Sequence, residues 1–199
     1  PTLAASYQIN DQVDFTFYSI LWTTPSFSHL GNGQGLWTEV GVGFNFKVLD
    51  GMFEINPQIG VTNGSLLSGA AQARALEGMI PTLTINHNET YTEGQFYMGY
   101  YVATSAPRQN DFLHWWISGG IKPFADSQDW KSTMSVGAHF EQLRLTRTAG
   151  GSPSDIYVWL GPYVQFALAD TLSLRFTSGW DLEGTLSPTF YKAAIGCSF

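Results

Sequence analysis

The sequence predicts an all-β protein, an up-and-down antiparallel transmembrane β-barrel, and three observations lead to this prediction. The segment 91–104 alternates between polar residues and large apolar residues, as a strand does when its two faces meet different surroundings. Segments of the same kind recur along the whole chain, separated by short and long connections. Charged residues make up only 13% of the 199 residues, about half of what a soluble domain usually carries.

The elements follow one another as a meander of hairpins. We predict strands at 2–9, 13–24, 35–48, 52–64, 78–87, 91–104, 111–124, 131–146, 155–168, 171–181 and 189–199. Short turns are expected at 10–12, 49–51, 87–90, 125–130 and 169–170, and long loops at 25–34, 65–77, 105–110, 147–154 and 182–188. Short and long connections alternate strictly, which leaves no room for crossover helices. The loop 65–77 is the one segment whose composition is compatible with a short helix.

Sorting the residues of each strand by parity separates an apolar face, which holds no Asp, Glu, Lys or Arg, from a polar face rich in glycine. The apolar residues, in strand order, are Phe15, Phe17 and Leu21; Val40, Val42, Phe44 and Phe46; Phe53, Ile55, Ile59 and Val61; Leu83 and Ile85; Phe96, Met98, Tyr100 and Val102; Leu113, Trp115, Ile117 and Ile121; Met134, Val136, Ala138 and Phe140; Val158, Leu160, Val164 and Phe166; Leu172, Leu174 and Phe176; Tyr191, Ala193, Ile195 and Phe199. Soluble lipocalin-like barrels and sandwiches also alternate, but they place charges outside. The bulky apolar face favours a barrel with a polar interior.

Composition limits the classes of function. No uncharged apolar run reaches the roughly 18 residues of a membrane-spanning helix, and no linker divides the chain, so one domain over 1–199 is expected. The net charge of -7 argues against a nucleic-acid partner, which would need a basic stripe. The single Cys197 and the spacing of the four histidines argue against a metal site. We therefore expect no cofactor, no metal and no nucleic acid.

The last residues, Tyr191-Lys-Ala-Ala-Ile-Gly-Cys-Ser-Phe199, resemble the C-terminal strand of Gram-negative outer-membrane β-barrel proteins, which typically ends in Phe. The resemblance is porin-like in architecture and identifies no subfamily. It implies a bacterial outer-membrane location, with the long loops outward and the short turns periplasmic. Because bacterial barrels normally have an even number of strands, the eleven segments predict about twelve strands in the intact barrel, with one N-terminal strand outside this sequence. Ten strands are the alternative.

The polar face supplies the candidate site residues, whose charges are of mixed sign. The expected lumen-lining or solute-binding residues are Glu39, Lys47, Glu54, Glu93, Tyr97, Tyr101, His114, Trp116, Lys122, His139, Glu141 and Arg175. Lys47 and Glu54 flank the turn 49–51 and are expected to form an ion pair.

Aromatic residues and histidines on the polar face have two interpretations each. By parity, Trp22, Trp37 and Trp159 point inward at the outer mouth, where they form either a stacking platform for a ligand or a packed plug. His114 and His139 lie near glutamates in depth and could act in acid–base chemistry. No Ser or Cys nucleophile is placed beside them, so hydrogen-bonded lumen histidines are the preferred interpretation, and no catalytic residue is expected.

Three functions follow from this pattern. The leading hypothesis is a passive channel for small polar solutes, with a constriction formed by the lumenal charges. The alternative is a structural or assembly barrel with a filled lumen that binds a partner, since buried charges are tolerated when paired. The second alternative is an outer-membrane enzyme acting on lipid or peptide. The expected partners are outer-membrane lipid, a small polar solute, and a protein partner or a second copy of the chain.

Overall fold

The large sheet follows the predicted meander. The computed structural model describes residues 2–24, 35–64, 67–68, 71–72, 77–104, 110–128, 130–147, 152–169, 172–183 and 188–197. Its strands are β1 (Thr2–Asn10), β2 (Val13–Thr24), β3 (Gly35–Val48), β4 (Phe53–Gly64), β7 (Gly78–Asn88), β8 (Thr92–Ala103), β9 (Asp111–Ile121), β10 (Met134–Arg147), β11 (Ser154–Ala169), β12 (Leu172–Asp181) and β13 (Thr189–Cys197). Each strand pairs antiparallel with the next one in the order β1-β2-β3-β4-β7-β8-β9-β10-β11-β12-β13. The prediction of an all-β, up-and-down sheet with eleven strand segments is confirmed.

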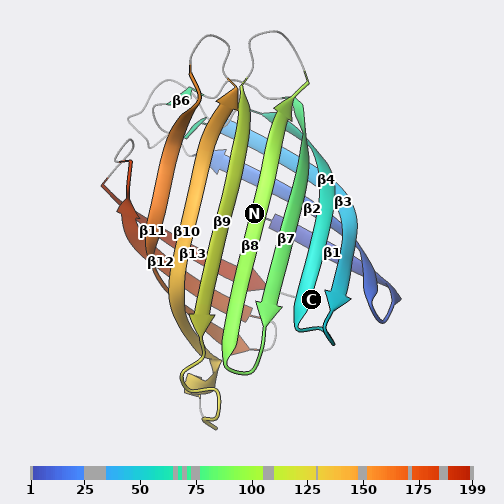
Figure 1. Cartoon of the computed structure of the whole chain (residues 1–199), viewed down its shortest axis with the longest axis vertical. Coiled ribbons are helices and arrows are strands. Elements are labelled where there is room, and N and C mark those ends of the chain that lie inside the picture. The colour runs from blue at the N-terminus through green and yellow to red at the C-terminus, as the bar shows by residue number, and fades with distance from the viewer. Residues whose placement is uncertain are drawn as a thin grey trace.

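The sheet curls but its two edges are not joined. Figure 1 shows β7 to β10 in front, while β1 and β2 pass behind them on one side and β12 and β13 on the other. Each of the edge strands β1 and β13 has a single partner strand in the described sheet. Because eleven strands alternate in direction, β1 and β13 run the same way, from the long-loop end to the short-turn end.

Two connections differ from the prediction. The loop 65–77 is compatible with a short helix by composition, but its described part contains β5 (Leu67–Ser68) and β6 (Ala71–Gln72), which pair with each other. Between β9 and β10, the short 3-10 helix η1 (Trp130–Thr133) extends a connection that had been assigned partly to strands. None of the described helical residues forms a helix long and apolar enough to cross a membrane.

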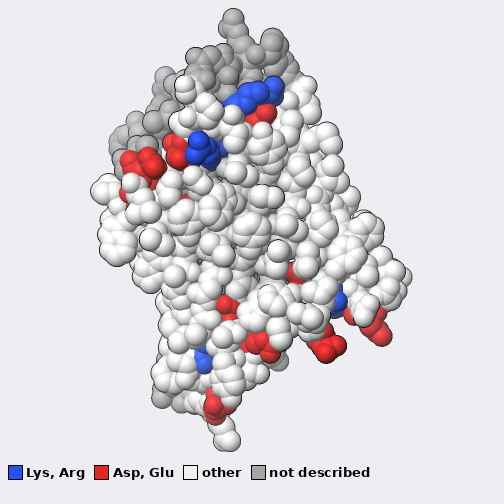
Figure 2. Space-filling view, viewed as in Figure 1, with Lys and Arg blue, Asp and Glu red and all other residues white. Residues whose placement is uncertain are grey.

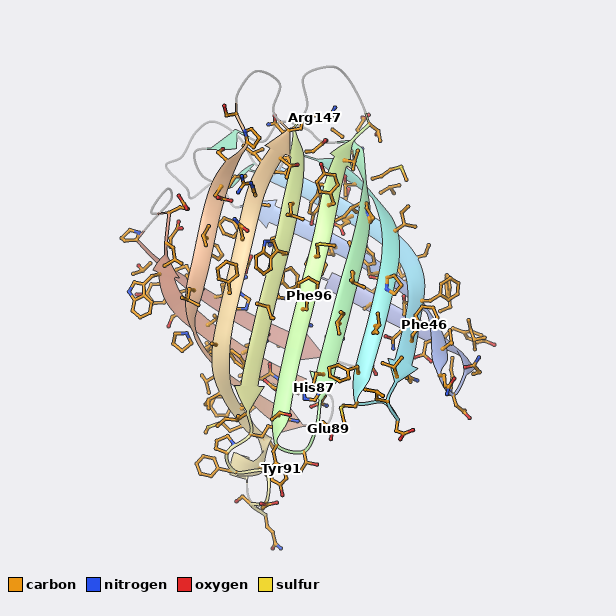
Figure 3. The ribbon with its side chains drawn as sticks, viewed as in Figure 1. Phe46, His87, Glu89, Tyr91, Phe96 and Arg147 are labelled. Carbon is orange, nitrogen blue, oxygen red and sulfur yellow. The ribbon has the colours of Figure 1, made fainter. Side chains whose placement is uncertain are left out.

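The two faces of the sheet are reversed relative to a soluble barrel, as parity predicted. The inner face holds buried polar residues, including Asp14, Asn45 and Ser118, whereas large apolar side chains such as Phe44 and Ile117 are exposed on the outer face. Figure 2 shows a broad uncharged belt across the middle of the visible face, with Lys, Arg, Asp and Glu gathered toward the two ends. In Figure 3, Arg147 lies at the long-loop end, and Glu89 and Tyr91 lie at the short-turn end.

Glycines on the inner face make room for a tyrosine that lies across two neighbouring strands. Tyr18 of β2 is the register partner of Gly41 on β3, and Gly41 is the partner of Gly60 on β4. A Cβ atom added to either glycine would overlap the Tyr18 side chain. The missing side chains therefore let a large ring lie flat along the sheet and fill the interior near Ile80, which is 0% exposed.

Candidate functional site

The centre of the interior is a carboxylate surrounded by hydrogen-bond donors from four strands. Glu141 of β10 accepts a hydrogen bond of 2.8 Å from the Tyr157 hydroxyl of β11, and the Lys192 ammonium of β13 donates to its Oε2. Nε2 of His114 on β9 lies 3.0 Å from Oε1, and Nε2 of His139 on β10 lies 3.0 Å from Oε2. We call these five residues the Glu141 cluster.

The donors compensate the burial of a charge. Glu141 is 3% exposed, and a carboxylate removed from water without partners is very unfavourable. Each carboxylate oxygen of Glu141 has two hydrogen-bond partners, and all four partners are side chains of the protein. Lys192 is less enclosed, with 41% of its side chain exposed. Its contact with Glu141 links the edge strand β13 to β10 across the inner face.

Stacked aromatic rings enclose the Glu141 cluster on both sides. The register partners of Glu141 are Trp116 on β9 and Trp159 on β11. Trp116 stacks on Tyr97 with a centroid separation of 3.9 Å, and Trp159 stacks on Phe190 at 4.8 Å. Trp159 also stacks on Tyr157 of the cluster at 4.0 Å. These rings extend the cluster into a packed layer that spans β8 to β13.

A second carboxylate, which is partly buried, lies nearer the short-turn end. Glu93 of β8 accepts hydrogen bonds of 2.7 Å from the Ser135 hydroxyl of β10 and from the Tyr163 hydroxyl of β11. Tyr163 reaches it by passing over Gly137 of β10 and Gly120 of β9, where an added Cβ would overlap the tyrosine. This repeats the arrangement of Tyr18 on the opposite part of the sheet. The two neutral donors hold Glu93 without a direct ion pair among the described residues.

The prediction that Lys47 forms an ion pair with Glu54 across the turn 49–51 is wrong. Lys47 and Glu54 are register partners, as expected, but the Lys47 ammonium lies 3.0 Å from Asp14 on β2. Lys122 follows the end of β9, and its ammonium donates to the Asn88 side chain at 2.6 Å and to the Glu89 carbonyl at 2.7 Å. Its role is to close the short turn.

Residues 1–199 match the family described as "Family of unknown function (DUF6733)". The chain belongs to this family. No curated protein and no solved structure matches it. The described part of this DUF6733 protein contains no group of three or more His, Cys, Asp or Glu residues that could hold a metal ion. His114 and His139 each contact a Glu141 oxygen at hydrogen-bonding distance.

The remaining predicted residues of the DUF6733 chain are distributed over other parts of the interior. Glu39 is 2% exposed and interacts electrostatically with Tyr97, Tyr101 and Tyr18. Trp22 and Trp37 are register partners on β2 and β3, but their side chains lie outside the described residues.

The candidate site residues chosen from the sequence did not include four residues that complete the two carboxylate sites. Tyr157 and Lys192 belong to the Glu141 cluster, and Ser135 and Tyr163 hold Glu93. Their position along each strand predicts that all four side chains point inward. Strand position alone does not predict how far along the barrel axis a side chain lies relative to those on other strands, because that depends on the register of several successive hairpins.

Proposed function

We propose that this DUF6733 protein is an outer-membrane β-barrel with a filled interior, which acts as a structural or partner-binding barrel instead of an open pore. The observation that carries the proposal is the Glu141 cluster. A carboxylate held by donors from β9, β10, β11 and β13 and enclosed by stacked rings occupies the middle of the polar face. Such a layer fills the space through which a solute would pass.

The membrane assignment is supported by the outer face. Exposed Phe, Ile, Leu and Val side chains cover the outer face of the sheet. On the face visible in Figure 2, the charged residues gather toward the two ends. The hydrocarbon of a bilayer tolerates this pattern, whereas water does not favour it. We place the long loops outward and the short turns in the periplasm, following the resemblance of the C-terminal strand.

Closure of the barrel belongs to the same proposal. Unpaired backbone groups on β1 and β13 would be costly in lipid, because the hydrocarbon offers no hydrogen-bond partner. The two edges run parallel to each other. One further strand of opposite direction between them pairs antiparallel with both and brings the total to twelve, an even number typical of bacterial barrels.

Burial of the inner face favours a filled interior over the passive channel. Glu39 and Ser135 are each 2% exposed, and Glu141 is similarly enclosed. Side chains that line an aqueous channel would be in contact with water. The channel remains the second candidate because amide side chains on the inner face toward the short-turn end, including Gln58, Asn86 and Gln95, are only partly buried. They favour a hydrated entrance on that side.

Conductance in planar bilayers separates these two functions. We expect the wild-type protein to insert and to produce no discrete conductance steps. The double variant Tyr97→Ala with Trp116→Ala removes one stacked pair beside Glu141, and it is expected to produce steps under the same conditions, which also demonstrates insertion. Reproducible steps from most wild-type insertions would instead establish the channel. Heat-modifiable migration in mild detergent and recovery in the outer-membrane fraction test the membrane assignment separately.

A further inference from the structure

Arg175 of β12 is a cation on the inner face whose hydrogen bonds are incomplete. Its guanidinium lies over the Tyr163 ring, 3.8 Å from the centroid. Nη2 of Arg175 is buried and has no hydrogen-bond partner among the described residues. Buried polar groups in folded proteins nearly always have a partner, and an unpaired cationic donor is among the least favourable exceptions. The position therefore calls for an acceptor that the described residues do not supply.

The neighbouring carboxylates do not satisfy this guanidinium. Glu93 is close enough to interact electrostatically with Arg175, but no ion pair or hydrogen bond joins them, and Oε1 of Glu93 accepts from Ser135 and Tyr163. Glu141 accepts from Lys192, which lies two positions from the register partner of Arg175 on β13. Both carboxylates are thus held by other donors.

The inner face between Arg175 and the short-turn end is built from small side chains. Ala194 is the register partner of Arg175 on β13 and is exposed. The next inward pair along β12 and β13 is Ser173 and Gly196, and Gly196 is exposed as well. Arg175 is the fourth residue of β12, so it lies roughly 10 Å along the strand from the short-turn end. Among the described residues of these two strands, the inner face on that side of Arg175 therefore carries only small side chains.

We propose that Arg175 anchors a binding site for a small oxyanion, a carboxylate or phosphate group, that enters from the short-turn end. The planar guanidinium matches two oxygens of such a group at once, which a lysine ammonium cannot do. Gln165, the register partner of Arg175 on β11, offers an amide beside it. The guanidinium lies against the face of the Tyr163 ring, which fixes its orientation. The site is independent of whether the interior is filled or open farther along.

Titration with inorganic phosphate tests the site. Wild-type protein in zwitterionic micelles is titrated by calorimetry at constant ionic strength, with chloride as the balancing anion. Arg175→Gln is expected to weaken phosphate binding at least tenfold, since a charged, two-point contact is lost. Glu93→Gln is expected to tighten it several-fold, because the nearest repelling carboxylate is removed. Arg144→Gln removes an exposed cation that faces outward and pairs with Asp155, and it should leave binding unchanged.

A second arm identifies the source of the oxyanion. Micelles that contain phosphatidylglycerol are compared with micelles of phosphatidylcholine, and heat-modifiable migration verifies that each variant is folded. Binding of free phosphate alone indicates a soluble ligand, and stabilisation by phosphatidylglycerol that Arg175→Gln abolishes indicates a lipid headgroup. If Arg175→Gln does not fold, Arg175→Lys keeps the charge and loses the two-point contact, and it should weaken binding. Equal binding by wild type and the Arg175 variants, or no binding in either arm, would overturn the proposal.

Discussion

Tyr163 and Glu93 are joined by a hydrogen bond of 2.7 Å although two other strands lie between theirs. The ring of Tyr163 crosses β10 and β9 at Gly137 and Gly120, and its hydroxyl then meets the carboxylate on β8. A single side chain thereby connects four strands on the polar side of the sheet. The glycines are required by close approach, because the register places each of them directly beneath the ring.

Substitution of Gly120 tests this arrangement. A methyl group there would overlap the Tyr163 hydroxyl and approach the Val136 carbonyl, so Gly120→Ala is expected to destabilise the protein by about 1–3 kcal/mol, as overpacking does. Gly119 is the matched control on the same strand, because an added Cβ there meets nothing within 4 Å. Urea unfolding in micelles, followed by tryptophan fluorescence, measures both. Equal stability of the two variants would show that Tyr163 adopts another position.

The Glu141 cluster predicts an asymmetry between its members. Glu141→Leu leaves Lys192, His114 and His139 without their shared acceptor, and a cost of about 3–5 kcal/mol is expected for breaking a buried charged site. Lys192→Met should cost about 1 kcal/mol or less, because its side chain is partly exposed and Glu141 retains other donors. The same unfolding measurement compares them. A larger loss of stability from Lys192→Met than from Glu141→Leu would contradict this prediction and show that the contact between β13 and β10 contributes most of the stability.

Substitutions at Lys47 test whether its ion-pair partner is Asp14, as in the structure, or Glu54, as expected from the turn 49–51. A double-mutant cycle between Lys47→Met and Asp14→Asn is expected to give a coupling energy of about 0.5–1 kcal/mol, since this ion pair is partly buried. The cycle between Lys47→Met and Glu54→Gln should give a coupling energy near zero. A reversal of the two values would restore the original pairing.

Tyr91 gives a pH-dependent prediction outside the strands. Its hydroxyl donates a hydrogen bond of 3.0 Å to Asp126 in the neighbouring connection, and this bond raises the pKa of the tyrosine above its ordinary value. A raised pKa means that the stabilisation is complete below the unfolded-state pKa and disappears as the pH rises through the folded-state pKa. Ultraviolet titration should show that Asp126→Asn lowers the pKa of one tyrosine. An unchanged titration curve would exclude the bond.

Much of the fold followed from the sequence because strand periodicity is local. Alternation with a period of two residues assigned Phe96 and Met98 to the outer face and Glu93 and Tyr97 to the inner face without any knowledge of neighbouring strands. Turn-forming residues set the boundaries of the hairpins to within a few residues at most positions. The exceptions were the connection containing η1 and the loop containing β5 and β6, where local composition did not distinguish a strand end from irregular structure.

The partners of the inner-face residues were decided by the tertiary structure alone. Parity assigned Lys47, Glu141 and Lys192 to the interior, but it could not state that Lys47 meets Asp14 or that Lys192 meets Glu141. Those contacts depend on the register added up over successive hairpins, on the curl of the sheet and on the reach of long side chains. The sequence by itself determined which side chains face inward, because that is a property of each strand. Which of them meet is a property of the assembled sheet.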